Sequence, residues 1–417
     1  MTPEIKQRIE QIRRGEVPER YVKTALGLAP ANWKRYTFGD IYTERKEPGD
    51  ENLPLLMVSI HSGVSDGEVD AAELPKQVKR IEDKSQYKKA VSGDLVFNMM
   101  RAWQGAIGTV RTTGMVSPAY IVAEPNDKVY PLFMDYYSRT PQMINQIDRQ
   151  SYGVTDFRKR LYWDSFAPIG CTLPPIEEQQ KIAAILTTQD KVIELKEKRL
   201  AEKQRQKKYF MQQLLTGKKR LPGFSGEWKK TKLKNILYER KTYSPKGLEY
   251  PHVTLSAEGI FPKSERYDRD HLVRDEDKEY KITHKGDICY NPANLKFGAI
   301  CENTFGDAIF SPIYVTFEVE ENICKEYIAN YLMRWDFINA VRKYEEGTVY
   351  ERMAVKPEDF LKFEIFLPQI EEQAAIAEVL STADREIELL QQDIEQEKQK
   401  KKALMQLLLT GIVRVKT

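Results

Sequence analysis

The segment LPPIEEQ at residues 173–179 recurs as LPQIEEQ at residues 367–373, and this recurrence decides the architecture of the chain. The two copies are displaced by 194 residues. Much of the remaining sequence repeats at this displacement to within about a residue, which indicates a duplicated chain. The clearest other matches are Trp33 with Trp228, Glu44-Arg45-Lys46 with Glu239-Arg240-Lys241, Gly93-Asp94 with Gly286-Asp287, Asn98 with Asn291, Gly105-Ala106-Ile107 with Gly298-Ala299-Ile300, and Thr216-Gly217 with Thr410-Gly411.

Each copy changes character at the repeated segment. The preceding part, about 140 residues, mixes short β-branched and aromatic runs with Gly, Pro, Asn and Asp, which predicts a sheet-containing α+β domain. After the segment, Gly and Pro are missing for about 40 residues and good helix formers dominate, which predicts one long helix per copy. Glu177 and Glu178 suit the start of the first helix, and Gly217 suits its end; Glu371, Glu372 and Gly411 are the equivalents in the second.

Both predicted helices carry a heptad repeat in the same register. Residues seven apart are Leu186, Ile193, Leu200, Lys207 and Leu214 in the first, and Leu380, Ile387, Ile394, Lys401 and Leu408 in the second. Such a seam needs a partner helix, either its own duplicate or another protein. We favour pairing within the chain, which predicts an antiparallel coiled coil with an approximate two-fold axis.

The predicted fold is therefore α+β, with two similar sheet-containing domains separated by two long antiparallel helices that form a coiled coil with pseudo-two-fold symmetry. The expected boundaries are an N-terminal helical extension at 1–29, a first domain at 30–172, a central long helix at 173–219, a second domain at 220–366 and a C-terminal long helix at 367–417.

Composition excludes several classes of protein. The chain has 417 residues, 41% hydrophobic and 30% charged, unlike disordered or collagen-like sequences. No apolar run reaches the ~18 residues of a membrane span, and residues 1–10 lack the apolar core of a signal peptide, so we expect a cytoplasmic protein. Four cysteines without a C-x-x-C pair predict buried free thiols rather than a metal site. The net charge of +3 indicates no partner by itself.

Two similar but diverged domains at a fixed separation suit a partner that presents two sites, such as duplex DNA. Basic, amide and aromatic side chains in Gly- or Pro-rich loops are the candidates, because Arg pairs with guanine, Asn and Gln with adenine, and Lys with phosphate. A Gly-Thr loop followed by Arg can also approach a phosphate. The alternatives are ordinary solvated charges and an ordinary turn. The candidates are Arg45, Lys46, Arg101, Trp103, Gln104, Arg158 and Lys159 in the first domain, and Arg240, Lys241, Asn294, Lys296, Phe297 and Arg352 in the second.

The repeated Leu-Pro-x-Ile-Glu-Glu-Gln segment, the long charged helix ending in Leu-Leu-Thr-Gly and the tryptophan at the start of each variable domain closely resemble the specificity subunit of type I restriction-modification systems. The resemblance covers essentially the whole chain. It implies two target recognition domains, 30–172 and 220–366, each reading one half of a bipartite, asymmetric site in the major groove of double-stranded DNA. It also implies that the helices, 174–217 and 368–411, form a spacer that docks two modification (methyltransferase) subunits.

By the same resemblance, the assembled complex is a DNA adenine methyltransferase, and restriction subunits add ATP-dependent cleavage. Residues 1–29 are expected to complete the arrangement near the C-terminus. Within the chain itself the sequence favours a reader without an active site, cofactor or metal. Residues 291–294 (NPAN) lack the second proline and the aromatic of a methyltransferase loop, and no phosphate-binding G-x-x-x-x-G-K-[ST] loop is present. A fused nuclease or methyltransferase, and a pure assembly scaffold, remain the alternative functions.

Overall fold

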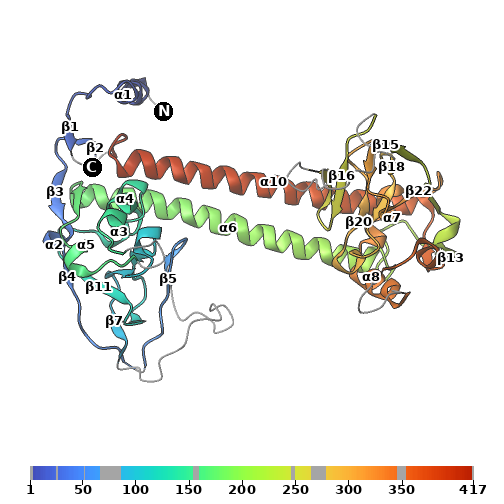
Figure 1. Ribbon diagram of the computed structural model, residues 1–417, viewed down its shortest axis with the longest axis horizontal. Coiled ribbons are helices and arrows are strands. Elements are labelled where there is room, and N and C mark those ends of the chain that lie inside the picture. The colour runs from blue at the N-terminus through green and yellow to red at the C-terminus, as the bar shows by residue number, and fades with distance from the viewer. Residues whose placement is uncertain are drawn as a thin grey trace. The chain divides into compact units, whose positions relative to one another are not determined.

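The computed structural model describes residues 3–24, 27–50, 52–65, 86–153, 159–245, 249–263, 279–344 and 354–415. The chain divides into two compact units, here called unit 1 (Met1–Lys196 with Asp393–Thr417) and unit 2 (Glu197–Gln392). Each unit contains one α+β part and a portion of each of the two long helices, α6 (Ile176–Leu214) and α10 (Ile370–Leu409) (Figure 1). The predicted α+β fold with two long helices is confirmed.

Unit 1 is built around a four-stranded antiparallel sheet with the strand order β4-β11-β8-β9. The described residues of unit 1 also form four two-stranded sheets, β1-β2, β3-β12, β5-β6 and β7-β10. Its strands are β1 (Tyr21–Thr24), β2 (Gly27–Pro30), β3 (Lys34–Thr37), β4 (Tyr42–Glu44), β5 (Val58–Ser59), β6 (Gly63–Val64), β7 (Lys88–Ala90), β8 (Leu95–Asn98), β9 (Ile107–Thr109), β10 (Gly114–Val116), β11 (Tyr120–Pro125) and β12 (Gly170–Leu173). Its shorter helices are α1 (Pro3–Arg13), α2 (Phe38–Ile41), the 3₁₀ turn η2 (Ala102–Gln104), α3 (Pro131–Tyr137), α4 (Pro141–Arg149) and α5 (Trp163–Phe166).

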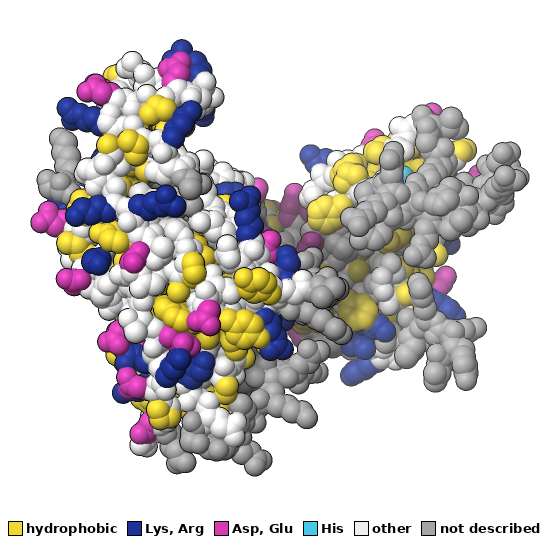
Figure 2. All heavy atoms as spheres, turned by 60° about the vertical axis from the view of Figure 1, so that its left-hand side comes forward, with side chains coloured by type: hydrophobic (Ala, Val, Ile, Leu, Met, Phe, Trp, Pro, Cys, Tyr) yellow, Lys and Arg dark blue, Asp and Glu magenta, His cyan; other side chains and the backbone are white. Residues whose placement is uncertain are grey.

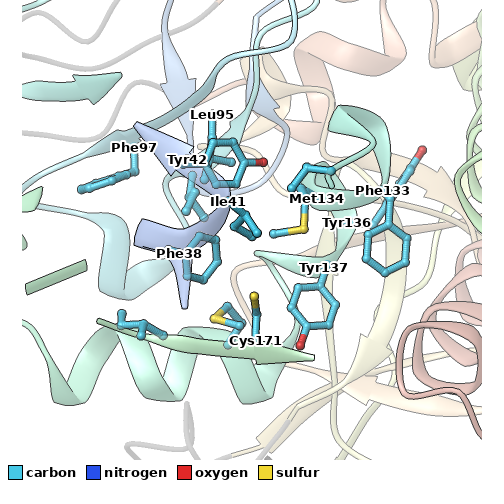
Figure 3. Packing of buried hydrophobic residues seen from close by; sticks show 14 of the residues in the cluster. Phe38, Ile41, Tyr42, Leu95, Phe97, Phe133, Met134, Tyr136, Tyr137 and Cys171 are labelled. Atoms are coloured by element: carbon cyan, nitrogen blue, oxygen red, sulfur yellow. The ribbon is translucent and has the colours of Figure 1, made fainter. Parts of the chain in front are cut away.

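A hydrophobic cluster covers each face of the central sheet of unit 1. Successive residues of a strand point to opposite faces and so join different clusters. Leu95 and Phe97 of β8 join a large core with residues of α3, α4, α5 and α6. Between them, Val96 faces a second cluster that includes Val58 and Val64 of the β5-β6 hairpin. Figure 3 shows the first core, where side chains from α2, β8, α3 and β12 converge. The sheet therefore provides a rigid base for the connections at its ends.

Unit 2 repeats this plan. Its four-stranded sheet has the order β14-β22-β19-β20, the same order as the equivalent strands of unit 1. Its strands are β13 (Lys229–Lys232), β14 (Leu237–Glu239), β15 (Tyr243–Pro245), β16 (Val253–Ser256), β17 (Gly259–Pro262), β18 (Glu279–Thr283), β19 (Ile288–Tyr290), β20 (Ile300–Glu302), β21 (Ala308–Phe310), β22 (Val315–Val319) and β23 (Glu364–Leu367). Its shorter helices are η4 (Leu233–Asn235), η7 (Leu295–Phe297), α7 (Lys325–Leu332), α8 (Trp335–Val341), η8 (Arg342–Tyr344) and α9 (Pro357–Leu361).

The core of unit 2 centres on stacked aromatic rings. Tyr290 of β19 stacks on Phe360 of α9 and on Phe317 of β22, with ring centroids 4.9 and 5.9 Å apart. The hydroxyl group of Tyr290 donates to the carbonyl oxygen of Val355 at 3.0 Å, so this buried polar group is satisfied. The end of β19 is thereby fixed to the segment that precedes α9.

The long helices pair antiparallel within each unit. In unit 1, Gln189 of α6 donates to Glu397 of α10, and Lys196 forms ion pairs with Asp393 and Glu397 at 2.8 and 2.9 Å. In unit 2, Lys203 pairs with Glu386 and Lys207 with Asp384. The numbering on α10 falls as that on α6 rises, which defines the antiparallel direction.

The predicted heptad seam lies at this helix pairing. Leu186, Leu214, Leu380 and Leu408 are all buried. The lysines that interrupt the seam form equivalent ion pairs, Lys207 with Asp384 in unit 2 and Lys401 with Asp190 in unit 1. No helix in the described part of the chain is long and apolar enough to cross a membrane.

Candidate nucleic-acid interface

The repeated LPxIEEQ segment builds the junction between each α+β part and its long helix. In unit 1, Glu178 is fully buried and accepts two charge-assisted hydrogen bonds from Arg414, at 2.6 and 2.7 Å. The indole Nε1 of Trp33 also donates to Glu178, at 3.3 Å. Gln179 is equally buried, and its side chain bonds the backbone of Lys128, Tyr130 and Pro174. The segment is therefore structural rather than a ligand site.

Unit 2 contains the same junction. Glu372 is buried and accepts from Arg220 at 2.5 and 2.6 Å and from Trp228 Nε1 at 3.3 Å. In each junction the arginine follows the end of one long helix and the glutamate begins the other. The hydrogen bonds to these carboxylates raise the pKa of Arg220 and of Arg414.

Sequence reasoning missed these arginines, although Arg220 and Arg414 are also 194 residues apart. The helix ends that precede these arginines are as predicted. Gly217 and Gly411 have φ of 69° and 70°, in the left-handed region that favours glycine. The N-terminal segment lies beside the second of these ends. Tyr21 donates to the carbonyl oxygen of Gly411 at 2.6 Å, and Arg8 donates to that of Ile412 at 2.9 Å.

The structure assigns a structural role to two arginines that the sequence suggested for DNA binding. The side chain of Arg45 is only 10% exposed and bonds both oxygens of buried Asp94, at 2.7 and 3.2 Å. Arg240 bonds Asp287 in the same way, at 2.9 and 3.0 Å. Hydrogen bonding to the partner carboxylate raises the pKa of both guanidinium groups. Both guanidinium groups therefore have partners inside their units, and contact of Arg45 and Arg240 with DNA stays a prediction.

The neighbouring lysines are placed differently. The side chains of Lys46 and Lys241 are 78% and 68% exposed. Each forms an ion pair at the surface, Lys46 with Glu44 at 3.2 Å and Lys241 with Glu239 at 3.5 Å. The side chains of Glu44 and Glu239 are only 17% and 15% exposed, but the ammonium groups of the two lysines are open to solvent, where a phosphate can reach them.

The turn between β8 and β9 brings together four of the predicted residues of unit 1. Arg101 and Gln104 are exposed, and Trp103 between them is half-buried. The Nζ of Lys159 lies 5.1 Å from the centroid of a Trp103 ring and donates to Asp148 at 2.8 Å. Basic, amide and aromatic groups thus share one surface, and the basic and amide groups are of the kinds that contact phosphates and base edges.

A second segment returns to this turn from α4. Tyr152 and Arg160 form an isolated antiparallel bridge, and the amide of Leu161 donates to the carbonyl oxygen of Met99 at 2.8 Å. These contacts place the two ends of the Gly-Thr loop beside the β8–β9 turn. Arg158, the predicted phosphate contact on this loop, lies outside the described residues.

In unit 2 the turn between β19 and β20 carries the equivalent positions. Asn294 and Phe297 are exposed, and Lys296 is half-buried. The Nζ of Lys296 lies 5.3 Å from the centroid of the Phe297 ring. The following loop is anchored as in unit 1, because the amide of Val355 donates to Pro292 at 3.4 Å. Arg352 lies outside the described residues.

Both turns have a fixed backbone. The carboxamide oxygen of Asn98 accepts from the amide of Met100 at 2.9 Å. The carboxamide oxygen of Asn291 accepts from the amides of Ala293 and Asn294 at 3.1 and 3.3 Å. Gly105 and Gly298 close the turns with φ of 105° and 81°. Asn291 is therefore a turn former, and the NPAN sequence at 291–294 belongs to the turn that follows β19.

The charge distribution is mixed. On the face that Figure 2 turns forward, Lys and Arg side chains alternate with Asp and Glu, and hydrophobic side chains are exposed among them. The described residues contain no group of three or more His, Cys, Asp or Glu side chains that could hold a metal. The sequence Glu-Asp-Lys, which contains the Glu-x-Lys of metal-dependent nucleases, occurs at 82–84 and at 276–278, and both copies lie outside the described part of the chain. Burial raises the pKa of the Cys171 and Cys301 thiols to about 12, so these cysteines are unsuited to nucleophilic chemistry.

Comparison with known proteins identifies the family of the chain. The chain matches the type I restriction modification DNA specificity domain over residues 72–204 and 226–399. The putative type I restriction enzyme MjaX specificity subunit of Methanocaldococcus jannaschii is 24% identical over 447 residues, covering 96% of this chain and 98% of that protein. The MjaVIII specificity subunit of the same organism is 24% identical over 364 residues, covering 80% of this chain and 83% of that protein.

Solved structures share the fold. The HsdS subunit from Thermoanaerobacter tengcongensis has a TM-score of 0.50 at 18% identity, covering 92% of this chain and 98% of that one. The S subunit of a type I restriction-modification system from M. genitalium has a TM-score of 0.55 at 10% identity, covering 93% and 97%. Because the family match includes both repeats and most of the sequence, the chain belongs to the type I restriction-modification DNA specificity family.

Proposed function

We propose that unit 1 and unit 2 each read one half of a bipartite, asymmetric DNA site through the major groove. One observation carries this proposal: the two units keep the same turn backbone and differ in the side chains that the turn exposes. Equivalent positions hold different chemistry, namely Arg101 against Asn294, Trp103 against Lys296, and Gln104 against Phe297. Different side chains on one scaffold are suited to different half-sites.

The chemistry of unit 1 favours hydrogen-bond readout. An arginine such as Arg101 matches the two acceptors on the guanine edge, and a glutamine such as Gln104 matches the donor and acceptor of adenine. The surface lysines Lys46 and Lys241, which are identical in the two units, suit phosphates because the DNA backbone is the same at every sequence. Lys159, Arg158 and Arg352 remain predictions for the same role.

The long helices are proposed to fix the gap between the half-sites and to dock two methyltransferase subunits. Their support is the heptad seam and the ion pairs along it, which give each helix one register against the other. Removing matched heptads from both helices is expected to change the tolerated gap. An unchanged gap would show that the helices do not set it.

The chain is proposed to be a non-catalytic recognition subunit, located in the cytoplasm. With modification subunits it would direct DNA adenine methylation, and with restriction subunits ATP-dependent cleavage. Methylation or cutting of DNA by the chain alone would instead indicate a fused enzyme. Assembly without any sequence preference would indicate a scaffold.

The decisive experiment exchanges residues 220–366 for those of another family member. The hybrid and the parent are each assembled with the modification subunits, and the methylated sites are sequenced. We expect one half of the two-part site to change and the other half, with the gap, to stay. A change in both halves or in neither would contradict the proposal.

A further inference from the structure

Unit 2 exposes two apolar side chains at one end of its four-stranded sheet. Tyr290 pairs with Ile300 on one side and with Val315 on the other, so the turn after β19 and the turn before β22 leave the sheet at the same end. Phe297 lies on the first turn and Ile313 on the second, and they are 63% and 60% exposed. These are two of the most exposed large apolar side chains among the described residues.

The equivalent end of unit 1 carries different groups at these two positions. The strands pair in the same way there, with Asn98 opposite Tyr120 on β11. Gln104 takes the place of Phe297, and Ala119 takes that of Ile313. Unit 1 does expose Met100 on its turn, but the matching residue of unit 2 is Ala293. The units therefore differ in chemistry at matched points of one scaffold.

The backbone under Phe297 is held in place before any ligand binds. Its amide donates to the carbonyl oxygen of Asn294 at 2.9 Å, and Gly298 follows in the left-handed conformation. Lys296 places its ammonium group against the ring of Phe297, 5.3 Å from the centroid. An apolar ring next to a cation suits a surface that meets base edges between phosphates.

We infer that unit 2 recognises thymine through its 5-methyl group, with Phe297 and Ile313 as the contacting side chains. This inference rests on the proposed function of unit 2 as a DNA reader. Thymine is the base that presents a methyl group in the major groove, and apolar side chains read it by contact rather than by hydrogen bonding. Neither Phe297 nor Ile313 has a polar side-chain atom, so neither can read a base edge by hydrogen bonding.

The test replaces each thymine of the cognate half-site with deoxyuridine, which removes the methyl group and keeps every hydrogen-bonding group. The chain is assembled with its modification subunits, and duplex binding is measured by competition. At a contacted position the affinity is expected to fall about fourfold, the effect of one buried methylene-sized group. In the F297A or I313A variant, the thymine and deoxyuridine duplexes are expected to bind equally at that position.

The matched control is M100A, which removes an exposed apolar side chain from the equivalent turn of unit 1 and is expected to leave the thymine preference of the unit 2 half-site unchanged. Equal binding of thymine and deoxyuridine at every position of this half-site would overturn the inference. A preference that persists in both F297A and I313A would also overturn it. In either case, continued binding to a two-part site would leave the proposed function standing, whereas loss of all sequence preference in the wild-type complex would refute that function.

Discussion

Replacement of Arg414 by methionine is predicted to destabilise unit 1 by leaving a carboxylate buried without its cation. Glu178 is fully buried, and Arg414 supplies two of its three side-chain hydrogen bonds. After the substitution only Trp33 Nε1, at 3.3 Å, still donates to it among these partners. Methionine keeps the length of the aliphatic part of the side chain, so the change mainly removes the charge and its donors.

The expected cost follows from the burial of the pair. Removing one partner of a buried ion pair costs about 3–5 kcal/mol, because the other charge stays desolvated. The side chain of Arg414 is itself 32% exposed, which lets water reach the site and places the cost near the lower end, at about 3 kcal/mol. For a unit of this size, that corresponds to a fall of roughly 6–12 °C in the melting temperature.

Hydrogen–deuterium exchange and calorimetry together test this prediction. Exchange should accelerate in peptides from residues 176–186, where α6 begins, and stay unchanged in peptides from residues 370–380 of unit 2. The R220M variant is the matched control, since it removes the cation from Glu372 and should produce the opposite pattern. The double variant E178Q/R414M should recover more than half of the lost stability, because a neutral amide is less costly to bury than a carboxylate.

The reasoning is wrong if R414M lowers the free energy of unfolding by less than about 1 kcal/mol, since an unpaired buried carboxylate should destabilise the unit by more than that. It also fails if the double variant is no more stable than R414M. In that case the arginine would act through packing of its stem rather than through its charge.

Two further predictions concern charged groups. Arg45→Ala is expected to lower the stability of unit 1 by about 3 kcal/mol because buried Asp94 loses its partner. Lys46→Ala should change stability by less than about 0.5 kcal/mol and should lower the slope of log binding constant against log salt concentration by about one. Thermal unfolding measures the first effect and binding at several salt concentrations the second; equal stability losses in the two variants would contradict the distinction between them. Hydrogen bonds from Gln189, Lys196 and Lys400 lower the pKa of Glu397 from 4.5 to about 2, so its stabilising effect is complete above the unfolded-state pKa and is lost as the pH falls from about 4.5 to 2. Urea unfolding followed by circular dichroism at pH 5 and pH 2.5 should show a smaller acid-induced loss in E397Q, and an identical loss would exclude Glu397 as a contributor.

The repeat predicted the fold because residues that both copies need for folding recur at the same positions in each. The heptads of α6 and α10 showed where the helices pair, and the matched Lys207 and Lys401 are the positions of equivalent ion pairs. The partners of those lysines, Asp384 and Asp190, are also 194 residues apart, but their distance along the chain from the lysines hid the pairing. Long-range ion pairs leave no local pattern, whereas helix seams do.

The same limit explains why the internal partners of Arg45 and Arg240 were not predicted. Both are candidates for DNA contact because arginine can pair with guanine or neutralise a phosphate, whereas the acidic partner of each lies 49 or 47 residues further along the chain. A signal did exist: Gly93-Asp94 and Gly286-Asp287 repeat together with the arginines. Two charged residues of opposite sign that are both kept between copies are candidates for a pair within the fold.

This gives a physical rule for separating scaffold from reader in a duplicated recognition protein. Both copies must fold alike, so groups that satisfy buried partners are the same in each, as are Trp33 and Trp228 on their glutamates. Both copies are proposed to meet the same phosphate backbone, so exposed lysines such as Lys46 and Lys241 are expected to stay the same without carrying sequence information. Bases are what differ between the two halves of an asymmetric site. The exposed positions that differ on a matched backbone, Gln104 against Phe297 above all, are therefore where specificity has to be sought.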